Sequence, residues 1–368
     1  MSTRKNKFSK KDKKFMNLAL HLASARHGLT GKNPSVGCII VKKDEIISIG
    51  QTGYNGRPHA EYNAIKNSNV SLEGSTMYVT LEPCCHYGQT PPCTKEIIKN
   101  KINKIIYSVE DVDKKVRGKS FKILMLKNIN VKKGLLKKKI IEFYEPYFFN
   151  RSKKVPYVTG KIAISKNNLI FSKGTKRITN IHSDKLTHFL RYKNDSLMIS
   201  YKTLNEDNPK LDCRLEGLSK FSPKRIILDN NLEMNTNSYI FKTANKNNTI
   251  IFYKNADIAK ISIFKKKGIQ LIKSNLLKNQ YFDIKSILKK LYILGCRNLL
   301  VEGGNDLSRS IIKNKLFNQF YLFKSSKNLS KLVDYRSFNT FNELSKKYKT
   351  KKKINTLLGK DLITLYKK

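Results

Sequence analysis

The feature that most restricts the fold of this chain is an alternation of strand-like and helix-like segments that occurs twice along its 368 residues. Short apolar runs bounded by turn residues predict buried strands, and apolar residues at helical spacing predict amphipathic helices. Such alternation favours α/β domains in which helices cover a largely parallel sheet. A chain of this length is also more typical of two domains than of one. We therefore expect two α/β domains in series.

The first series occupies residues 13–111. Helical spacing predicts a helix over 13–28 that stops at Gly28. The remaining expected elements are a loop entering a buried strand at 33–41, its hairpin partner at 45–53, strands at 75–83 and 102–111, and helices at 59–68 and 93–101. This order predicts an α/β sandwich of roughly 145 residues. The basic, polar stretch at 1–12 is expected to be a disordered tail.

The second series begins after a predicted domain boundary at 144–165, where aromatic residues, a basic patch and a proline precede a new strand. Its expected elements are helices at 185–194 and 281–295, and strands at 196–201, 223–230, 248–255 and 297–304. The C-terminal stretch is Lys-rich and weakly patterned. We expect a first domain at 13–148 and a second at 155–368.

The net charge of +47 first suggests a nucleic-acid partner. Of the 74 basic residues, however, 12 are Arg and 62 are Lys, and they are spread from end to end. Nucleic-acid binding usually gathers basic residues on one face and enriches Arg. Asn and Ile are also abundant and Trp is absent, which drift toward A/T-rich codons explains. We expect no specific nucleic-acid partner, although the charge should attract anionic substrates.

The chain contains no run of eighteen apolar residues, so we expect neither a spanning helix nor a membrane partner. The N-terminus has no signal-peptide pattern, and the cytoplasm is therefore the expected location. The six Cys would then be free thiols. Clustered thiols in a reducing compartment favour a metal site or catalysis over disulfides.

Two motifs together have the composition of a zinc deaminase site. "PHAEYNAI" places His59 and Glu61 at the start of a predicted helix, and "LEPCCHYGQTPPC" places Cys84 and Cys93 around the start of another. One imidazole and two thiolates can hold Zn²⁺ with a position left for water, whose pKa falls to about 7 when bound. We therefore assign His59, Cys84 and Cys93 as metal ligands. Glu61, one turn from the imidazole, is assigned as the catalytic residue that carries protons without binding the metal.

Taken singly, these residues have simpler explanations. His59 could cap a helix, and either cysteine could be a small buried apolar residue. Their combination in this order favours a metal site. Cys85 cannot easily face the same tetrahedral ion as its neighbour Cys84, so we assign it to packing, with His86 as a candidate for substrate contact. Cys38 lies in an apolar strand and is expected in the core.

"NPSVGCIIV", "PHAEYNAI" and "YVTLEPCCHYGQTPPC" resemble the deaminase half of the bifunctional riboflavin-biosynthesis deaminase–reductase family. The eight residues between Cys84 and Cys93 distinguish that family from base and nucleoside deaminases, which usually have Cys-x-x-Cys. The resemblance covers residues from about 15 to 145. It implies a cytidine-deaminase-like α/β/α sandwich that hydrolyses the ring amine of a diaminopyrimidine carrying a ribosylamino phosphate. It also implies that Asn33 lies in the loop that binds the pyrimidine.

The deaminase half departs from the family pattern at two places. Gln89 stands where a basic residue is usual in the family. The segment "EDVDKKVRGKS" at 110–120 stands where the family has Asp-Pro-x-Pro before a Gly-rich turn. Neither departure removes a metal ligand or Glu61.

The rest of the chain resembles the reductase half of the same family, which has a dihydrofolate-reductase-like α/β fold and uses NADPH. The matching segments are "KIAIS", "TLNEDNPKLDCR", "RIILD" and "LLVEGGNDL". A strand that ends in Glu-Gly-Gly and opens a helix lets backbone N–H groups approach a phosphate, which suits the diphosphate of NADPH. A plain turn is the alternative explanation for the Gly-Gly pair.

The family pattern implies two sets of reductase residues. The substrate-binding set is Thr175, Arg191, Leu211, Arg214 and Glu302. The cofactor-binding set is Ala163, Arg177, Thr203, Asp207, Asn230, Gly304, Asn305 and Asp306. Two arginines suit a ribose phosphate, because a guanidinium fork fits phosphate oxygens bidentately. For Arg191 alone, a solvated position on a Lys-rich helix is the alternative.

The reductase half departs further from its family. Where the family has Ser-Leu-Asp-Gly, this chain has Ser-Lys-Asn-Asn, so the carboxylate is lost at Asn167, although Asn168 can adopt the positive φ of a turn. Arg177 stands where the family has a Trp beside the nicotinamide. The segment "FNQFYLFKSSKNLSK" lacks the usual acidic pair, Pro and Gly. A deaminase with a vestigial reductase therefore stays open as an alternative.

The resemblance implies a cytoplasmic bifunctional enzyme with Zn²⁺ and NADPH as cofactors. Its deaminase would remove the 2-amino group of 2,5-diamino-6-(5-phosphoribosylamino)pyrimidin-4(3H)-one, and its reductase would convert the ribosyl group to ribityl. The expected partners are this small molecule and, in a homo-oligomer, further copies of the chain. The charge leaves a nucleic-acid deaminase or RNA-binding protein as a second alternative, and a scaffold that keeps an inactive deaminase fold as a third.

Overall fold

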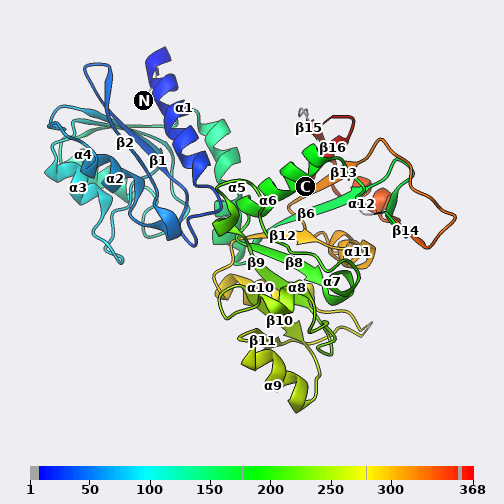
Figure 1. Cartoon of the computed structure of the whole chain (residues 1–368). Helices are drawn as coiled ribbons and strands as arrows, with labels where there is room; N and C mark the ends of the chain where they lie inside the picture. The colour runs from blue at the N-terminus through cyan, green and yellow to red at the C-terminus, as the bar shows by residue number, and fades with distance from the viewer. Residues whose placement is uncertain (1–7, 176, 279, 355–358) are drawn as a thin grey trace. The chain divides into compact units, whose positions relative to one another are not determined.

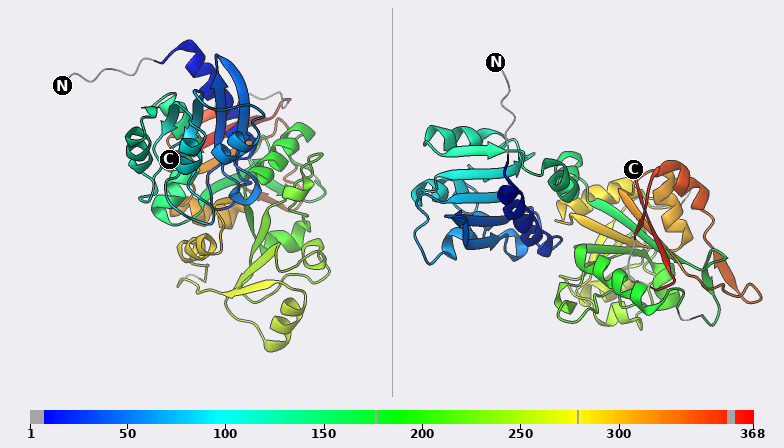
Figure 2. Two further views of the ribbon diagram at one scale, coloured as in Figure 1. Left: turned by 90° about the vertical axis from the view of Figure 1, so that its left-hand side faces the viewer. Right: turned by 90° about the horizontal axis from the view of Figure 1, so that it is seen from above.

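The chain folds into two compact α/β units, which are divided between Lys154 and Val155 (Figure 1). The computed structural model describes residues 8–175, 177–278, 280–354 and 359–368. Figure 2 shows the alternating helices and strands of each unit from two further sides. Within the described residues, no helix combines the length and the apolar character needed to cross a bilayer. The mixed α/β class agrees with the prediction for both halves.

The N-terminal unit alternates helices with short strands. Its elements are α1 (Lys10–Ala25), β1 (Gly37–Lys42), β2 (Glu45–Gln51), η1 (Tyr54–Gly56), α2 (Ala60–Lys66), β3 (Thr76–Leu81), α3 (Cys93–Lys99), β4 (Lys104–Val109), α4 (Lys119–Leu126), β5 (Asn130–Lys133) and α5 (Lys137–Lys153). The predicted strands and helices up to residue 111 are all present, with ends that differ by a few residues.

The described strands of this unit form one sheet in the order β2-β1-β3-β4-β5. β1 is antiparallel to β2 and β3, whereas β3, β4 and β5 run parallel. α1 and α5 pack on one face, and α2, α3 and α4 pack on the other (Figure 1). Gly37 and Gly50 permit this close packing, because a Cβ would meet the Ala19 carbonyl oxygen in α1 or the Ala60 carbonyl oxygen in α2.

The first helix begins earlier than expected. The predicted tail at 1–12 is wrong for its last three residues, because α1 starts at Lys10. Ser9 caps the helix by accepting a hydrogen bond from the Asp12 N–H, and the Asp12 carboxylate accepts one from the Ser9 N–H. This reciprocal pair is a capping box, whose hydrogen-bonding groups satisfy the first turn. Residues 1–7 of the predicted tail lie outside the described residues.

Helix α5 occupies the first part of the segment 144–165, where a domain boundary was expected, and the N-terminal unit ends within that segment, at Lys154. Pro146 lies inside the helix. Two residues before it, the buried Tyr144 hydroxyl donates to the Ser35 carbonyl oxygen and shares a hydrogen bond with Thr80 Oγ1. Tertiary anchoring by Tyr144 therefore outweighs the local break that a proline predicts.

The C-terminal unit continues the alternation over a longer stretch of chain. Its elements are β6 (Tyr157–Ile164), β7 (Leu169–Ser172), α6 (Ile181–Lys193), β8 (Ser196–Ser200), α7 (Tyr201–Asp207), η2 (Ser219–Phe221), β9 (Lys224–Leu228), α8 (Tyr239–Lys242), β10 (Thr249–Tyr253), α9 (Ile258–Lys266), β11 (Gln270–Lys273), α10 (Ile284–Ile293), β12 (Asn298–Glu302), α11 (Asn305–Lys313), β13 (Gln319–Lys324), β14 (Tyr335–Ser337), α12 (Phe341–Lys347), β15 (Thr350–Ile354) and β16 (Leu362–Lys367).

Its main sheet has the order β11-β10-β9-β8-β12-β6-β13-β16-β15 over the described residues. The strands from β11 to β13 are parallel, as predicted, and β16 and β15 add an antiparallel edge. The weakly patterned C-terminal stretch supplies this edge. β15 consists mainly of exposed lysines, so its pairing with β16, and not an apolar pattern, defines it as a strand.

Both faces of this sheet are buried. Along β8, Met198 belongs to one apolar cluster, whereas its neighbours Leu197 and Ile199 belong to the cluster on the opposite face. A parallel sheet covered on both faces needs apolar side chains in both directions, which gives near-continuous apolar runs in the sequence. These runs explain why the strands expected at 196–201, 223–230, 248–255 and 297–304 were recognisable, and they correspond to β8, β9, β10 and β12.

Candidate active sites

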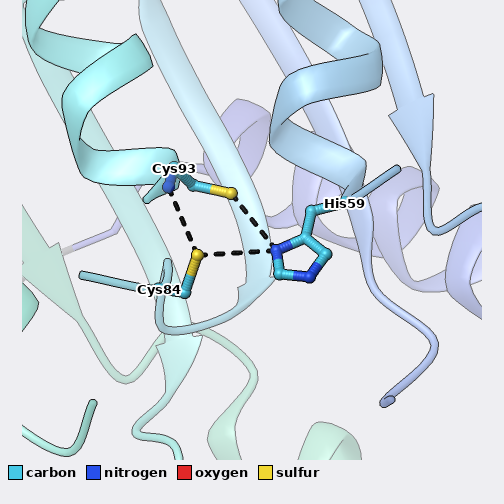
Figure 3. A group of neighbouring side chains, drawn as sticks. All are labelled: His59, Cys84 and Cys93. Atoms are coloured by element: carbon cyan, nitrogen blue, oxygen red, sulfur yellow. Dashed lines mark hydrogen bonds between the residues drawn. The ribbon is translucent and has the colours of Figure 1, made fainter. Parts of the chain in front are cut away.

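His59, Cys84 and Cys93 lie together at the helix-covered edge of the N-terminal sheet (Figure 3). His59 is the N-cap residue of α2, and Cys93 is the first residue of α3. Cys84 follows the end of β3, in the loop that leads into α3. Because α2 and α3 pack beside each other on one face, the N-terminal ends of the two helices meet at the end of that loop.

The distances among these side chains fit a zinc ion. His59 Nδ1 lies 3.5 Å from Cys84 Sγ and 3.4 Å from Cys93 Sγ. All three potential ligand atoms lie within 4.8 Å of one another. Tetrahedral Zn²⁺, with bonds of about 2.0 Å to nitrogen and about 2.3 Å to sulfur, would hold such a pair about 3.5 Å apart. The three predicted ligands therefore converge with the spacing and the soft donor atoms that zinc prefers.

The surroundings of Cys84 favour its thiolate. The Cys93 thiol, together with His59 and the Cys93 backbone N–H, hydrogen-bonds Cys84 and lowers its pKa, although burial opposes this shift. The backbone N–H of Cys93 lies 3.2 Å from Cys84 Sγ, at the N-terminus of α3. N–H groups at a helix start stabilise negative charge. The hydrogen bond with Cys84, followed by burial, raises the pKa of Cys93.

Glu61 is the buried acid beside these ligands. It lies on the first turn of α2, and its side chain is almost fully buried. Burial, reinforced by the negative charge of Cys84, raises the pKa of Glu61 to about 7, while His59 opposes the shift. A carboxyl group with a pKa near neutrality can both take up and release a proton. The predicted catalytic residue therefore has the environment of a general acid–base.

Glu82 is a supporting residue for which sequence reasoning assigned no role. It is buried between β3 and the cysteine loop, and its Oε2 accepts hydrogen bonds from the Asp111 and Gly118 backbone N–H groups. These bonds tie the loop after β4 to the base of the cysteine loop. The sequence did contain a clue to this role. Glu82 is an acidic residue between an apolar strand and Pro83, where an unpaired charge would be costly, so it must have hydrogen-bond partners.

The remaining predicted residues of this half have varied environments. The Asn33 side-chain amide donates to the Gly56 carbonyl oxygen, three residues before His59, and so joins the two loops. Cys38 is fully buried in the core. Cys85 lies apart from the metal cluster and hydrogen-bonds the Lys115 carbonyl oxygen. His86 Nδ1 is buried and has no partner within the described residues.

The C-terminal unit contains a cleft of about 830 Å³ at the carboxyl ends of its parallel strands. Five residues of the predicted cofactor-binding set line it: Thr203, Asn230, Gly304, Asn305 and Asp306. Gly304 precedes α11, and a Cβ there would meet only Thr203 Oγ1, at 3.7 Å, so its backbone is open to a ligand. Asn230 Oδ1 is buried without a partner in the described part of the chain. Such groups fit a polar cofactor.

A buried ion pair lies at the end of β12. Arg191 Nε and Nη2 donate to the two carboxylate oxygens of Glu302 at 2.7 and 2.8 Å, and Nη1 donates to the Asp212 carbonyl oxygen. Their side chains are 10% and 14% exposed. Burial acts to raise the pKa of Glu302, but the charge and hydrogen bonds of Arg191 outweigh burial and lower it. Glu302 therefore stays ionised, and the fork of Arg191 is already occupied.

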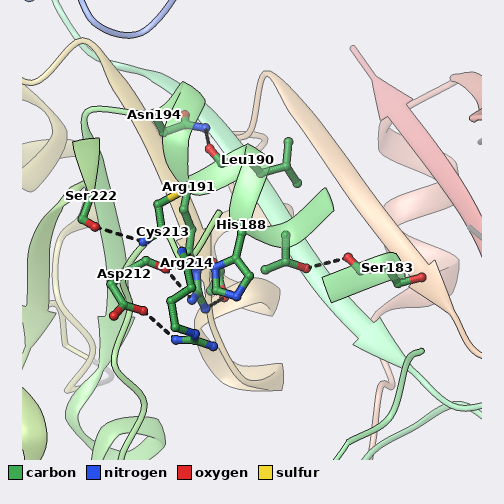
Figure 4. Close-up of polar contacts among 11 residues, drawn as sticks. Ser183, His188, Leu190, Arg191, Asn194, Asp212, Cys213, Arg214 and Ser222 are labelled. Carbon is green, nitrogen blue, oxygen red and sulfur yellow. Dashed lines mark hydrogen bonds and ion pairs between the residues drawn. The ribbon is translucent and has the colours of Figure 1, made fainter. Parts of the chain in front are cut away.

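Arg214 and His188 lie beside Arg191 and Asp212 (Figure 4). Arg214 is exposed and pairs through Nη1 with the Asp212 carboxylate at 2.6 Å. Its backbone N–H donates to His188 Nδ1. Burial and the charges of Arg191 and Arg214 lower the pKa of His188, so its neutral ring accepts this bond. Leu211, also in the predicted substrate set, is buried with φ 57° in the same loop.

Other predicted reductase residues lie outside the lining of the cleft. Thr175 follows β7 and is partly exposed, and its N–H donates to the Ser172 carbonyl oxygen. Arg177 is exposed and pairs with Asp184 at 2.8 Å. Ala163 lies on β6, and Asp207 is the last residue of α7. The sequence alone could not show that Arg177 has a surface ion-pair partner.

The altered turn after β6 is intact. Asn168 has φ 63°, so the predicted positive φ is confirmed. Asn167 Oδ1 accepts hydrogen bonds from Ser165 Oγ and the Leu329 N–H, and Asn167 Nδ2 donates to the Leu329 carbonyl oxygen. The amide that replaces the family carboxylate therefore binds a distant loop through both of its ends.

Family models match both units. The cytidine and deoxycytidylate deaminase zinc-binding region matches residues 9–109, and the RibD C-terminal domain matches residues 156–345. The chain is 33% identical to the riboflavin biosynthesis protein RibD of Aquifex aeolicus, over 97% of this chain and 98% of that protein. It is 31% identical to RibD of Actinobacillus pleuropneumoniae, over 96% and 95%.

Two solved structures match this chain over 97% of its length. A diaminohydroxyphosphoribosylaminopyrimidine deaminase/5-amino-6-(5-phosphoribosylamino)uracil reductase from Thermotoga maritima superposes with a TM-score of 0.82 at 27% identity, covering 97% of this chain and 98% of that one. RibD of Acinetobacter baumannii superposes with a TM-score of 0.83 at 24% identity, covering 97% and 99%. These matches confirm the predicted fold class of a deaminase-like unit followed by a reductase unit.

Proposed function

Because this chain belongs to the RibD family of riboflavin biosynthesis proteins, we propose that its two units carry out consecutive steps on one pyrimidine. The protein is a bifunctional enzyme of riboflavin biosynthesis, with a deaminase unit and a reductase unit. The proposed substrate is 2,5-diamino-6-(5-phosphoribosylamino)pyrimidin-4(3H)-one. The name of the relative from Thermotoga maritima supports this choice, since it specifies both the diaminopyrimidine and the uracil.

In the deaminase unit, His59, Cys84 and Cys93 would hold the metal, for which we propose Zn²⁺. The bound ion would supply Lewis-acid activation of water at neutral pH. The Glu61 carboxylate takes a proton from the attacking water and passes it to the ring nitrogen beside the reacting carbon. A second transfer from Glu61 lets the amine leave as ammonia. The raised pKa of Glu61 suits both transfers, because neither protonation state is strongly disfavoured.

In the reductase unit, the cleft beside Gly304 would hold a nicotinamide cofactor, for which we propose NADPH. When bound, the cofactor supplies the hydride that reduces the opened ribose. The backbone at Gly304 and the first turn of α11 would bind the cofactor's diphosphate. Asn230 Oδ1 would accept a hydrogen bond from a donor group elsewhere on the cofactor. Thr203, on the neighbouring α7, lines the same part of the cleft.

In this unit, Arg214 is a better candidate than Arg191 for binding the substrate phosphate. All three nitrogens of the Arg191 guanidinium already donate to Glu302 or Asp212, whereas Arg214 is exposed and uses only Nη1 in the described contacts. We therefore assign Arg191 a positioning role, in which it keeps the Glu302 carboxylate charged and oriented. Leu211 and Thr175 remain predicted substrate contacts.

The observation that carries the proposal is the convergence of His59, Cys84 and Cys93 beside the buried Glu61. The test is to incubate the zinc-loaded protein with the diaminopyrimidine ribosyl phosphate and follow ammonia and NADPH absorbance separately. We expect ammonia without NADPH, and NADPH oxidation only after deamination. Ammonia without any NADPH oxidation would favour the vestigial reductase. Activity on tRNA but not on the free pyrimidine would favour the nucleic-acid deaminase. Homo-oligomerisation and a cytoplasmic location stay predictions.

A further inference from the structure

Arg57 is a basic residue at the deaminase site that the functional assignments above do not use. It lies two residues before His59, and its side chain reaches across to the loop between Cys84 and Cys93. Arg57 Nε donates to Gln89 Oε1 at 3.0 Å, and Nη1 donates to Thr90 Oγ1. The guanidinium group therefore lies at the rim of the site, held by one loop against another.

The charge of Arg57 is not neutralised by a partner. Both of its hydrogen-bond acceptors, Gln89 and Thr90, are neutral, and none of the ion pairs among the described residues includes Arg57. A cation without a carboxylate beside a binding site is suited to attract an anion.

Arg57 also has an unused hydrogen-bond donor and open space beside it. Nη2 of Arg57 has no protein acceptor in the described structure, and it faces Gly88, where a Cβ would lie 3.7 Å away. The absence of a side chain at Gly88 keeps this side of the guanidinium accessible. Gln89 is exposed and uses its side-chain oxygen to hold Arg57. The guanidinium is thus fixed in place, with one nitrogen free to bind a ligand.

The proposed substrate carries its anionic group at a distance from the reacting amine. When the amine-bearing carbon faces Glu61, the ribosyl phosphate must extend toward the rim of the site. Gln89 cannot bind this phosphate by charge, although the family usually has a basic residue at that position. Arg57 contacts Gln89 directly and restores a positive charge next to it. A guanidinium group also binds phosphate oxygens through directed, charge-assisted hydrogen bonds.

We propose that Arg57 binds the phosphate-bearing arm of the pyrimidine in the deaminase unit and takes over the charge that Gln89 lacks. Gln89 and Thr90 act as positioning residues that hold the guanidinium at the rim. The inference rests on the proposed deaminase function. It assigns substrate recognition to a residue of this chain that its catalytic motif does not contain.

The test compares Arg57→Gln with the double variant Arg57→Gln/Gln89→Lys, on the phosphorylated pyrimidine and on its dephosphorylated nucleoside. Arg57→Gln should lower kcat/KM for ammonia release from the phosphorylated compound by about 10- to 100-fold, since it removes a hydrogen bond between charged groups. Release from the nucleoside should change less than threefold. The double variant should recover most of the loss on the phosphorylated compound, because it returns the charge to position 89.

Ribose 5-phosphate provides a second readout as an inhibitor of ammonia release, because this reaction reports on the deaminase site alone. Its inhibition constant should rise at least tenfold in Arg57→Gln and fall again in the double variant. Lys66→Gln is the matched control, because Lys66 is exposed at the other end of α2 from His59. It removes one positive charge from the same unit and should leave all three measurements unchanged.

Equal losses on the two pyrimidines, or no recovery in the double variant, would overturn the assignment and indicate that Arg57 only fastens the loops. Bound zinc, measured for every variant, should stay at the wild-type level. A wild-type protein that binds zinc but releases no ammonia from either compound would instead refute the proposed function, and the inference with it. The two failures are therefore distinguishable.

Discussion

The two active sites of this protein differ in how much of the chain each one uses. The metal ligands and Glu61 lie between His59 and Cys93 and come from two helix starts and one loop. The predicted reductase residues extend from Ala163 to Asp306 and come from many elements of a wide sheet. In a compact site, substitution of a few residues decides whether the chemistry is retained. In a distributed site, individual residues can be substituted while the cleft that binds the ligand is retained.

The reductase unit illustrates such exchange. The amide of Asn167 binds both backbone groups of Leu329, which a carboxylate could not do. Arg177, which replaces a family Trp, is engaged with Asp184 at the surface. The cleft beside Gly304 nevertheless has a volume of about 830 Å³. The departures from the family pattern therefore have local structural partners, and the cleft remains large enough for a cofactor.

Removing the metal should have the largest effect, because it should abolish the activity of the N-terminal unit and leave that of the C-terminal unit. After dialysis against a zinc chelator, ammonia release should fall to background, because the proposed ligands lie in the N-terminal unit. NADPH oxidation with the already deaminated substrate should persist, because residues of the C-terminal unit alone line the cleft. Added Zn²⁺ should restore ammonia release. A parallel loss of both activities would show that the sites are not independent.

Glu61→Gln should give the next largest effect. The variant keeps the size of the side chain but cannot carry protons, so kcat for ammonia release should fall about 10²- to 10⁴-fold. Zinc content should be unchanged, because Glu61 is not a proposed ligand. Hydride transfer to the deaminated substrate is the internal control. Retention of more than a tenth of wild-type ammonia release would assign the proton transfers to another group.

Arg191→Ala tests the buried pair of the reductase unit. It leaves the Glu302 carboxylate without its main partner, and breaking a buried ion pair costs about 3–5 kcal/mol. Hydrogen exchange should show the loss in peptides of the C-terminal unit, with peptides of the N-terminal unit as the reference. Arg191→Met/Glu302→Leu should regain stability without regaining NADPH oxidation. A single variant as stable as wild type would contradict the positioning role.

Asn167→Asp should give the smallest effect. It tests directly whether the reductase unit tolerates the replacement of the family carboxylate by the Asn167 amide. The substitution restores the family carboxylate but removes the Nδ2 donor to the Leu329 carbonyl oxygen, at a cost of about 1–2 kcal/mol. Asn168→Asp is the matched control, because the Asn168 side-chain oxygen accepts from the half-buried Lys324 ammonium group, which a carboxylate oxygen can also do, so this substitution should be neutral. Denaturant unfolding and NADPH oxidation are measured for both variants. Faster NADPH oxidation at unchanged stability would mean that Asn167 impairs the reductase.

The compact site could be predicted from the sequence because its chemistry is local. His59 and Glu61 lie at one helix start, and the two cysteines border another, so residue order alone indicated a metal and a proton carrier. Arg57 was not recognised, because its contacts to Gln89 and Thr90 depend on the folding of one loop against another.

Long-range pairing limited the prediction elsewhere. Arg191 and Glu302 are 111 residues apart, and no local pattern shows that the arginine fork is already occupied. α5 continues through Pro146 because Tyr144 is anchored to Ser35 and Thr80. β15 has no apolar pattern, because it is an exposed edge strand defined by its partner β16. These features follow from tertiary contacts that composition and periodicity do not encode.

X-ray absorption at the zinc edge of the purified protein tests the central claim most directly. We predict one ion per chain with two sulfur ligands at about 2.3 Å and two nitrogen or oxygen ligands at about 2.0 Å. Cys85→Ser should leave this spectrum unchanged, because Cys85 lies outside the cluster. A first shell without sulfur, or with three sulfurs, would contradict the convergence of His59, Cys84 and Cys93 on which the account depends.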